Sequence, residues 1–338
     1  MQYVSGKILT EKGFKKGYLG FTDNIIIETG NKNPPKKPIC KGLIVPTFVN
    51  CHTHIGDSFI RNKKIDFPKN LEELVAPPEG LKHRMLKNAS DEEIIEGMKN
   101  SIDVMKETGT SVFCDFRENG LKGIDLLNYA LNGKNISSII LSRPKKMAYN
   151  KNEIASILKK SSGIGLSSIS DWEFSELIKI SDQVKKAGKL FAIHASERVR
   201  EDIDKILDLK PDFLVHMVYA SESDLIRVKE SNIPIVLCYR SNVFFNLLPD
   251  IKLMKNVGVT LVLGTDNAML NTPNILDEIS YIKNHTKEFT IEELINMITV
   301  EPRKALNLKY SILGPNSPAD FVVLDKKCLK TLYISVNK

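Results

Sequence analysis

Short apolar runs alternate with longer amphipathic segments over most of the chain. Segments such as Asp91–Thr108, Asp171–Ala187 and Glu222–Glu230 repeat apolar residues at helical spacing, whereas the apolar runs have the length of buried strands. This alternation predicts βα units on a parallel sheet. The eight predicted strands are Leu43–His54, Val112–Arg117, Ser138–Ser142, Gly163–Ser167, Leu190–His194, Phe213–His216, Pro234–Tyr239 and Thr260–Asp266. Eight units predict an α/β fold, a (β/α)8 TIM barrel.

Both ends of the chain depart from this pattern. Near the N-terminus Val4–Leu9, Gly17–Phe21 and Ile25–Glu28 are short runs separated by turns, and Ala319–Leu324 is a similar run near the C-terminus. These runs predict a small composite β domain formed by residues 1–42 and 311–338. The barrel is then expected to span residues 43–310.

Length and composition suit either one large barrel or two medium domains. The chain has 338 residues, of which 42% are hydrophobic, and a net charge of +7 with no long run of like charges. Nucleic acid is therefore not an expected partner. Met1–Thr10 lacks the apolar core of a signal peptide, and no stretch reaches the roughly 18 apolar residues of a membrane span. We expect a soluble cytoplasmic protein with no membrane contact.

Two histidines at the end of the first predicted strand give the strongest chemical signal. His52 and His54 follow the apolar run Leu43–Val49 and are two residues apart. In a strand, residues at this spacing face the same side, so both imidazoles point into one space. Paired neutral imidazoles bind Zn²⁺ or Fe²⁺, although surface pairs of histidines are also common.

Other polar residues end predicted strands in the same way. His194, His216 and Asp266 each follow an apolar run, and the carboxyl ends of barrel strands meet at one mouth. Convergence on a metal explains all five residues at once, whereas the alternative requires five separate hydrogen-bonded core residues. His83 and His285 lie outside strand ends, and we expect His285 at the surface.

Several motifs then resemble one enzyme family. Val45–His54, His194–Glu197, Leu237–Asn242, Gly264–Asn267 and Ala319–Asp325 are similar, in order and spacing, to signatures of the amidohydrolase superfamily. The HxxE of His194 and Glu197 resembles the branch that contains cytosine, guanine and adenosyl-type deaminases and chlorohydrolases. Tyr239 stands where these relatives often have proline, and the chain is short for the branch.

The resemblance implies a role for each residue of the site. It implies that His52, His54, His194 and Asp266 ligate one divalent metal, with Zn favoured over Fe or Mn. Glu197 would shuttle protons, His216 would orient the attacking water, and Asp266 would also act as base. For Glu197 an alternative is an acid at a helix N-terminus, stabilised by the helix dipole.

The number of metal ions depends on the fourth strand. Many members of the superfamily carry two metals bridged by a modified lysine at the end of that strand. Here Gly163–Ser168 contains no lysine, so the sequence predicts one metal. A strand count shifted by one would bring Lys145 or Lys146 to this position instead.

Basic residues near strand ends suggest an anionic substrate. Only nine of the 48 basic residues are arginine, yet Arg117, Arg143 and Arg240 lie at or just past strand ends. Lys82 and Arg84 lie in the long segment after the first strand. Guanidinium groups suit carboxylate and phosphate, so these five are candidate substrate-binding residues. Alternatively, the arginines form structural ion pairs with Asp57, Asp115 or Glu118.

These observations predict a metal-dependent aminohydrolase, a deaminase that releases ammonia from a small nitrogen heterocycle or amidine. The expected partner is a small molecule, with an anionic substrate and a homo-oligomer as open alternatives. Two other functions remain: hydrolysis of a cyclic or linear amide, as in imidazolonepropionase-like or dihydroorotase-like relatives, and a non-catalytic metal-binding barrel. Metal storage alone would not require both Glu197 and His216, which favours an enzyme.

Overall fold

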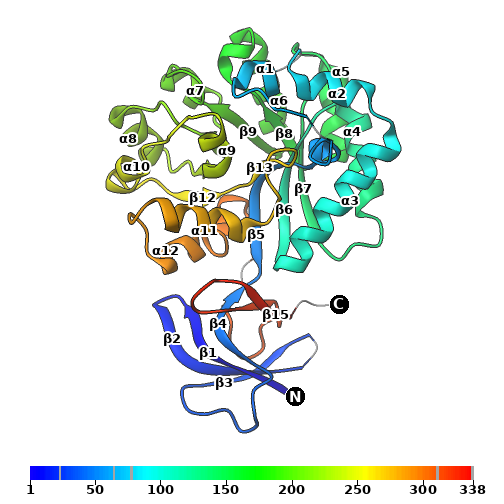
Figure 1. Cartoon of the computed structure of the whole chain (residues 1–338). Helices are drawn as coiled ribbons and strands as arrows, with labels where there is room; N and C mark the ends of the chain where they lie inside the picture. Colours follow the sequence, from blue (N-terminus) through cyan, green and yellow to red (C-terminus); the bar gives the residue numbers. More distant parts are fainter. Residues whose placement is uncertain (23, 64, 77–78, 310–311, 336–338) are drawn as a thin grey trace.

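The computed structural model describes residues 1–335 except 23, 64, 77–78 and 310–311. The described strands form a nine-stranded sheet, curled into a barrel, and a separate six-stranded sheet (Figure 1). The strands of the larger sheet are β5 (Phe48–His54), β6 (Thr110–Arg117), β7 (Ser137–Ser142), β8 (Gly163–Leu166), β9 (Leu190–Ala195), β10 (Phe213–His216), β11 (Ile235–Leu237), β12 (Leu261–Leu263) and β13 (Asp266–Asn267). The predicted TIM barrel is confirmed.

The eighth predicted strand closes the barrel by pairing on both sides. Its first part, β12, pairs with β11 in parallel, and its continuation, β13, pairs with β5. Between the two parts, Gly264 packs so closely on the first strand that a Cβ atom there would lie 2.7 Å from the Cβ of His52. Only glycine permits this approach, which brings Asp266 beside the His52–His54 pair.

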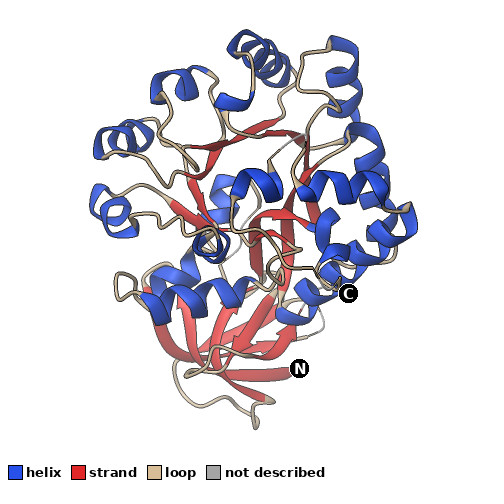
Figure 2. Cartoon of the chain, turned by 45° about the horizontal axis from the view of Figure 1, so that its top comes forward, coloured by secondary structure: helices blue, strands red, loops and turns tan. Residues whose placement is uncertain are grey.

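Helices surround the ring of strands (Figure 2). Their bounds are α1 (Leu71–Val75), α2 (Leu81–Asn88), α3 (Asp91–Thr108), α4 (Gly120–Leu131), α5 (Lys151–Lys160), α6 (Phe174–Lys186), α7 (Ile203–Asp208), α8 (Glu222–Glu230), α9 (Tyr239–Phe244), α10 (Ile251–Val257), α11 (Ile275–His285), α12 (Ile291–Asn296) and α13 (Glu301–Ala305), with 3₁₀ turns η1 (Ile55–Ile60) and η2 (Ile169–Asp171). The longest, α3, begins at a capping box of Ser90 and Glu93 and ends at Gly109 in the left-handed conformation.

The smaller sheet joins both ends of the chain below the barrel (Figure 1). Its strands run in the order β15-β14-β4-β1-β2-β3. Their bounds are β1 (Gln2–Thr10), β2 (Gly13–Phe21), β3 (Ile26–Gly30), β4 (Cys40–Pro46), β14 (Phe321–Leu324) and β15 (Thr331–Ser335). Its own apolar cluster includes Val4, Leu19 and Phe321.

The predicted strand Leu43–His54 is in fact two strands in two sheets. β4 pairs with β1 and β14 in the smaller sheet, and β5 begins the barrel after Thr47. The apolar run is continuous because both strands are buried, so hydrophobicity alone does not reveal the change of sheet. We therefore propose a domain boundary at Thr47 in place of Leu43, with the C-terminal strands completing the composite domain.

Candidate active site

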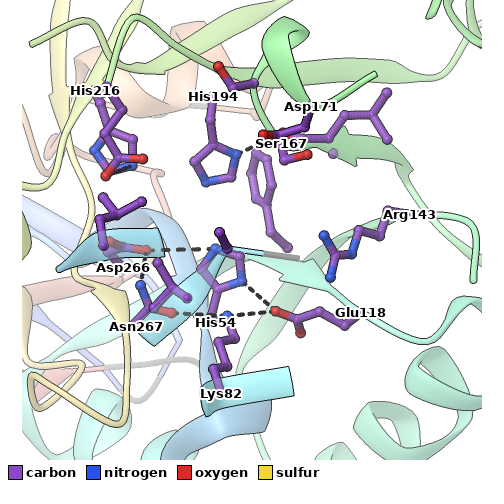
Figure 3. Close-up of a pocket in the computed structure, with 18 of the residues that line it drawn as sticks. His54, Lys82, Glu118, Arg143, Ser167, Asp171, His194, His216, Asp266 and Asn267 are labelled. Carbon is purple, nitrogen blue, oxygen red and sulfur yellow. Dashed lines mark hydrogen bonds and ion pairs between the residues drawn. The ribbon is translucent and has the colours of Figure 1, made fainter. Parts of the chain in front are cut away.

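Five polar side chains at strand ends converge at the mouth of the barrel, as the sequence predicts. Figure 3 shows four of them, His54, His194, His216 and Asp266. His52 and His54 lie on β5, His194 on β9, His216 at the end of β10 and Asp266 at the start of β13. The cleft above them has a cavity volume of about 80 Å³. The backbone of His216 has φ 75° and that of Asp266 has φ 60°, which is sterically unfavourable for residues other than glycine. Such strain is typical of functional sites.

The side chains form two overlapping groups that share His52. The first group contains His52, His54 and Asp266, and the second contains His52, His194 and His216. Within each group the potential ligand atoms lie within 4.8 Å of one another. Nε2 of His52 is 3.3 Å from Oδ1 of Asp266 and 3.2 Å from Nε2 of His194. Nε2 of His54 is 3.6 Å from the same carboxylate oxygen. Nitrogen and oxygen donors are thus gathered around one point.

Hydrogen bonds on the far side of two rings fix which nitrogen faces that point. Nδ1 of His194 donates to the carbonyl oxygen of Leu166 at 2.7 Å, and Nδ1 of His54 lies 3.0 Å from Oε1 of Glu118. The Nε2 atoms of both rings therefore face the other potential ligand atoms of the site. Partners of this kind orient metal-binding histidines and increase their basicity.

Burial keeps the imidazoles neutral. It lowers the pKa of His52, His54, His194 and His216, and that of His54 falls to about 3. A neutral imidazole has a free lone pair, and Asp266 adds a negative charge. This donor set suits a divalent metal of the borderline class, such as Zn²⁺.

The pKa values of two carboxyl groups in the cleft, Glu197 and Asp266, are shifted in opposite directions. Burial raises the pKa of Asp266, but contacts with His52 and its neighbours outweigh burial and hold it well below its usual range. Burial, followed by the charge of Asp266, raises the pKa of Glu197 well above the usual value. Opposite shifts of two nearby carboxyl groups are typical of an acid and a base that act together.

Glu197 reaches the site from a loop and not from a helix. The segment after β9 is irregular, and α7 begins only at Ile203, so the alternative of a helix N-terminal acid is wrong. Oε1 of Glu197 lies 3.3 Å from Nε2 of His216. Glu201 holds the loop by accepting hydrogen bonds from the backbone of Ser196 and the hydroxyl of Ser168.

Comparisons with known proteins agree with this geometry. The family model described as "Amidohydrolase family" matches residues 43–337. The chain belongs to the amidohydrolase family. An uncharacterized protein of Methanocaldococcus jannaschii is 39% identical over 326 residues, covering 90% of this chain and 81% of its own.

Two further relatives are named deaminases. A 5-methylthioadenosine/S-adenosylhomocysteine deaminase of Pyrococcus abyssi is 25% identical over 344 residues, covering 90% of this chain and 79% of its own. The crystal structure of Helicobacter pylori aminofutalosine deaminase superposes with a TM-score of 0.74 at 18% identity, covering 96% of this chain and 92% of its own, which confirms the fold.

This amidohydrolase is accordingly a metal-dependent hydrolase that acts on carbon–nitrogen bonds. Its fourth barrel strand is β8, which confirms the strand count, and β8 contains no lysine. Lys145 and Lys146 lie exposed in the segment after β7. In the described part of the chain, no helix has both the length and the apolar character of a membrane span.

Two of the arginines in the amidohydrolase are structural, contrary to the anion-binding expectation. Arg117 is buried and pairs with Glu118 and with Asp115, the latter at 3.0 Å. Arg240 pairs with Glu278 on α11 at 2.5 Å and is not among the residues that line the cleft. Each guanidinium group is already bound to carboxylates, so neither is free for a substrate anion.

Two other basic candidates, Arg84 and Lys82, differ in their position relative to the cleft. Arg84 donates to the carbonyl oxygen of Glu79 and lies outside the cleft. Nζ of Lys82 reaches the cleft but is buried 2.7 Å from Oε1 of Glu118 and donates to Asn267 at 2.9 Å. Its charge therefore supports Glu118, which in turn holds His54.

Arg143 differs from the other basic candidates. It lines the cleft and points into it from beyond β7 (Figure 3). Among the residues that the structure describes, no carboxylate lies within 4.0 Å of its guanidinium group. The guanidinium group instead lies 3.5 Å from Nδ1 of His83. Burial and the positive charge of Arg143 lower the pKa of His83 to about 3, so this neighbour is neutral. Arg143 thus presents to the cleft a guanidinium group that has no ion pair, although the charges of Glu118 and Asp171 act on it from a greater distance.

Sequence reasoning missed several residues that hold the site. The hydroxyl of Ser241 donates to Oδ2 of Asp266, and Asn267 donates to Oδ1 at 3.0 Å. The side chain of Asn242 lies 3.2 Å from Nδ1 of His216. All three belong to motifs that follow strand ends, and this position is the feature of the sequence that could have identified them. Glu118 was considered only as an ion-pair partner of arginine, although it also orients His54.

Proposed function

We propose that this amidohydrolase is a deaminase in which water replaces the amino group of a small nitrogen heterocycle or amidine and ammonia leaves. The observation that carries the proposal is a pair of carboxyl groups in one cleft whose pKa values are shifted in opposite directions: that of Glu197 is raised by burial and by Asp266, and that of Asp266 is held low by its contacts with the histidines. Replacement of an amino group requires an acid for the ring nitrogen and a base for water. The deaminase names of two relatives support the same reaction class.

We propose that His52, His54, His194 and Asp266 hold one Zn²⁺ ion. The inward Nε2 atoms, the neutral imidazoles and the carboxylate fit such an ion, and β8 lacks the lysine that a bridged pair of metals would use. When bound, the metal supplies Lewis acidity that lowers the pKa of water from 15.7 toward about 7.

The protein residues then move protons. Asp266, held by Ser241 and Asn267, accepts the proton of the attacking water. Glu197 protonates the ring nitrogen as the carbon is attacked. The amino group departs as ammonia after it receives the proton held by Asp266, and the proton left on the added oxygen returns to Glu197. His216, fixed by Asn242 and next to Glu197, orients the water.

We further propose that the substrate carries a carboxylate or phosphate group, which Arg143 binds. A guanidinium charge that is half-buried and has no ion pair is energetically costly, and a bidentate anion would pair with it. The neutral His83 leaves that charge available. Of the five basic residues considered from the sequence, only Arg143 combines a place in the cleft with an unpaired charge.

An ammonia-release assay tests the proposal. Purified protein with added Zn²⁺ would be screened against purines, pyrimidines, pterins and their carboxylated or phosphorylated nucleosides. Release of ammonia with one equivalent of oxygen incorporated from water is expected. Ring opening of a cyclic amide without ammonia would instead assign the protein to amide hydrolysis. Metal binding without turnover of any compound would favour the non-catalytic alternative.

Elemental analysis tests the metal proposal separately. We expect about one divalent ion per chain after saturation. Two ions per chain, both lost in a His52→Ala and His54→Ala double variant, would contradict the single-metal site.

A further inference from the structure

The smaller sheet, which lies below the barrel in Figure 1, carries a hollow of its own that shares no lining residue with the cleft of the barrel. Seven of its fourteen lining residues are lysines, and none is acidic. The whole chain has 48 basic and 41 acidic residues. Without these seven lysines the numbers are equal, so the excess positive charge of the protein equals the charge gathered in this hollow.

Three of these lysines project from adjacent strands. Lys7 on β1 lies directly opposite Lys16 on β2. Lys41 on β4 lies opposite Ser5, which shares the face of Lys7. All three side chains are exposed. Like charges directly opposite one another destabilise a sheet, so the free protein loses stability from this arrangement.

The remaining lysines surround the same hollow. Lys32, Lys36 and Lys37 lie in the segment between β3 and β4, and Lys326 follows β14. Pro34, Pro35 and Pro38 restrict the backbone of that segment, which reduces the entropy lost when a ligand orders it. In the described part of the chain, none of the seven lysines forms an ion pair within 4.0 Å.

We propose that this hollow binds a linear polyphosphate, a chain of three or more linked phosphoryl groups. Lysine binds phosphate as a point charge, and the lining contains no arginine, whose planar fork binds carboxylate and phosphate alike. The lining also lacks aromatic residues, on which the bases of single-stranded nucleic acid would stack. A concave site with seven separate charges matches several linked anionic groups better than one.

Calorimetry with inorganic tripolyphosphate tests this site in the full-length protein. The variant Lys7→Gln/Lys16→Gln/Lys41→Gln removes the three sheet lysines. The control Lys159→Gln/Lys186→Gln/Lys252→Gln makes the same change of net charge at exposed positions on α5, α6 and α10. We expect affinity to fall by at least about tenfold in the first variant and by less than about twofold in the control.

A stability measurement shows that the first variant is folded. Because the substitution relieves the repulsion between Lys7 and Lys16, its midpoint of urea unfolding without ligand should equal or exceed that of the unmodified protein. Equal loss of affinity in both variants would overturn the proposal, as would equal affinity for orthophosphate and tripolyphosphate. Tighter binding of duplex DNA than of tripolyphosphate would assign the surface to nucleic acid and also overturn it.

Competition with a nucleoside triphosphate shows whether the phosphate chain that binds is inorganic or belongs to a nucleotide. Equal affinity for the nucleotide and for inorganic tripolyphosphate supports recognition of the phosphate chain alone. Tighter binding of the nucleotide supports a nucleotide as the source of the chain.

Discussion

Glu118 lies 3.0 Å from Nδ1 of His54, and this contact determines which ring nitrogen faces the metal site. The carboxylate is also held by Lys82 at 2.7 Å and by Arg117. Although burial opposes ionisation, these cations and His54 hold the pKa of Glu118 well below its usual range. Its negative charge therefore persists in a buried environment and increases the basicity of His54.

Replacing Glu118 by glutamine should weaken metal binding. The substitution keeps the size of the side chain but removes the charge that supports His54, so we expect the affinity for Zn²⁺ to fall about tenfold to a hundredfold. Competition with a chromogenic chelator measures this loss. Glu96→Gln, on an exposed face of α3, is the matched control. A folded Glu118 variant with unchanged metal affinity would show that the contact does not support the ligand.

Replacing Glu197 by glutamine should separate chemistry from metal binding. The amide cannot donate the proton that the ring nitrogen requires, so turnover should fall by roughly 10²–10⁴ while the metal content stays the same. Ammonia release and elemental analysis on the same preparation provide both values. Glu230→Gln, at the exposed end of α8, controls for the change of charge. Normal turnover in the Glu197 variant would exclude it as the acid.

Stability should fall in acid, in part because of His83. Its folded pKa is lowered to about 3, mainly by burial and then by Arg143, whereas an unfolded histidine titrates near 6.5. Between these values only the unfolded state takes up the proton. Stability is therefore lost as the pH falls from about 6.5 toward 3, by up to about 1.4 kcal/mol per pH unit for one proton.

His83→Gln should reduce that dependence. Urea unfolding at pH 4, 5, 6 and 7 gives the slope of the unfolding free energy against pH, which is proportional to the number of protons taken up on unfolding. In the variant this number should fall by up to one. His285→Gln, at the exposed end of α11, is the control. An unchanged slope in the His83 variant would show that His83 is protonated in the folded protein.

Periodicity and strand ends explain why the sequence predicts so much of the site. The helices at Asp91–Thr108 and Glu222–Glu230 have the predicted bounds, because each has a capping box and a regular apolar face. His52, His194 and Asp266 meet because parallel strands carry their last residues to one mouth. Local sequence patterns, together with the rule that parallel barrel strands end at one mouth, therefore suffice to predict the proposed metal ligands.

Tertiary partners are less predictable. Arg240 and its partner Glu278 are 38 residues apart, and nothing in either local pattern marks them as a pair. Arg117 ends β6 and Arg143 lies just past β7, and both line the cleft, yet only Arg117 forms ion pairs among the described residues. The distinction depends on which carboxylates the fold brings near each guanidinium group, and that is a property of packing.

Arg143→Lys provides the test of the anionic substrate. The ammonium group keeps the charge but cannot form two parallel hydrogen bonds to one carboxylate or phosphate, so binding of the transition state should weaken by roughly 1.5–3 kcal/mol. The ratio of kcat/KM between the two proteins gives this value. Arg84→Lys, outside the cleft, should change kcat/KM by less than about twofold.

A substrate analogue without the acidic group isolates the contribution of the anion. For this analogue the Arg143 variant and the unmodified protein should differ little, because the contact that the substitution weakens is already missing. The difference between the two losses is the coupling energy of Arg143 with the anion. Equal losses for both compounds would mean that Arg143 supports the cleft without binding an anion, for instance by holding His83 at 3.5 Å. That result would refute the anionic substrate while leaving the deaminase reaction, which depends on Glu197 and Asp266, intact.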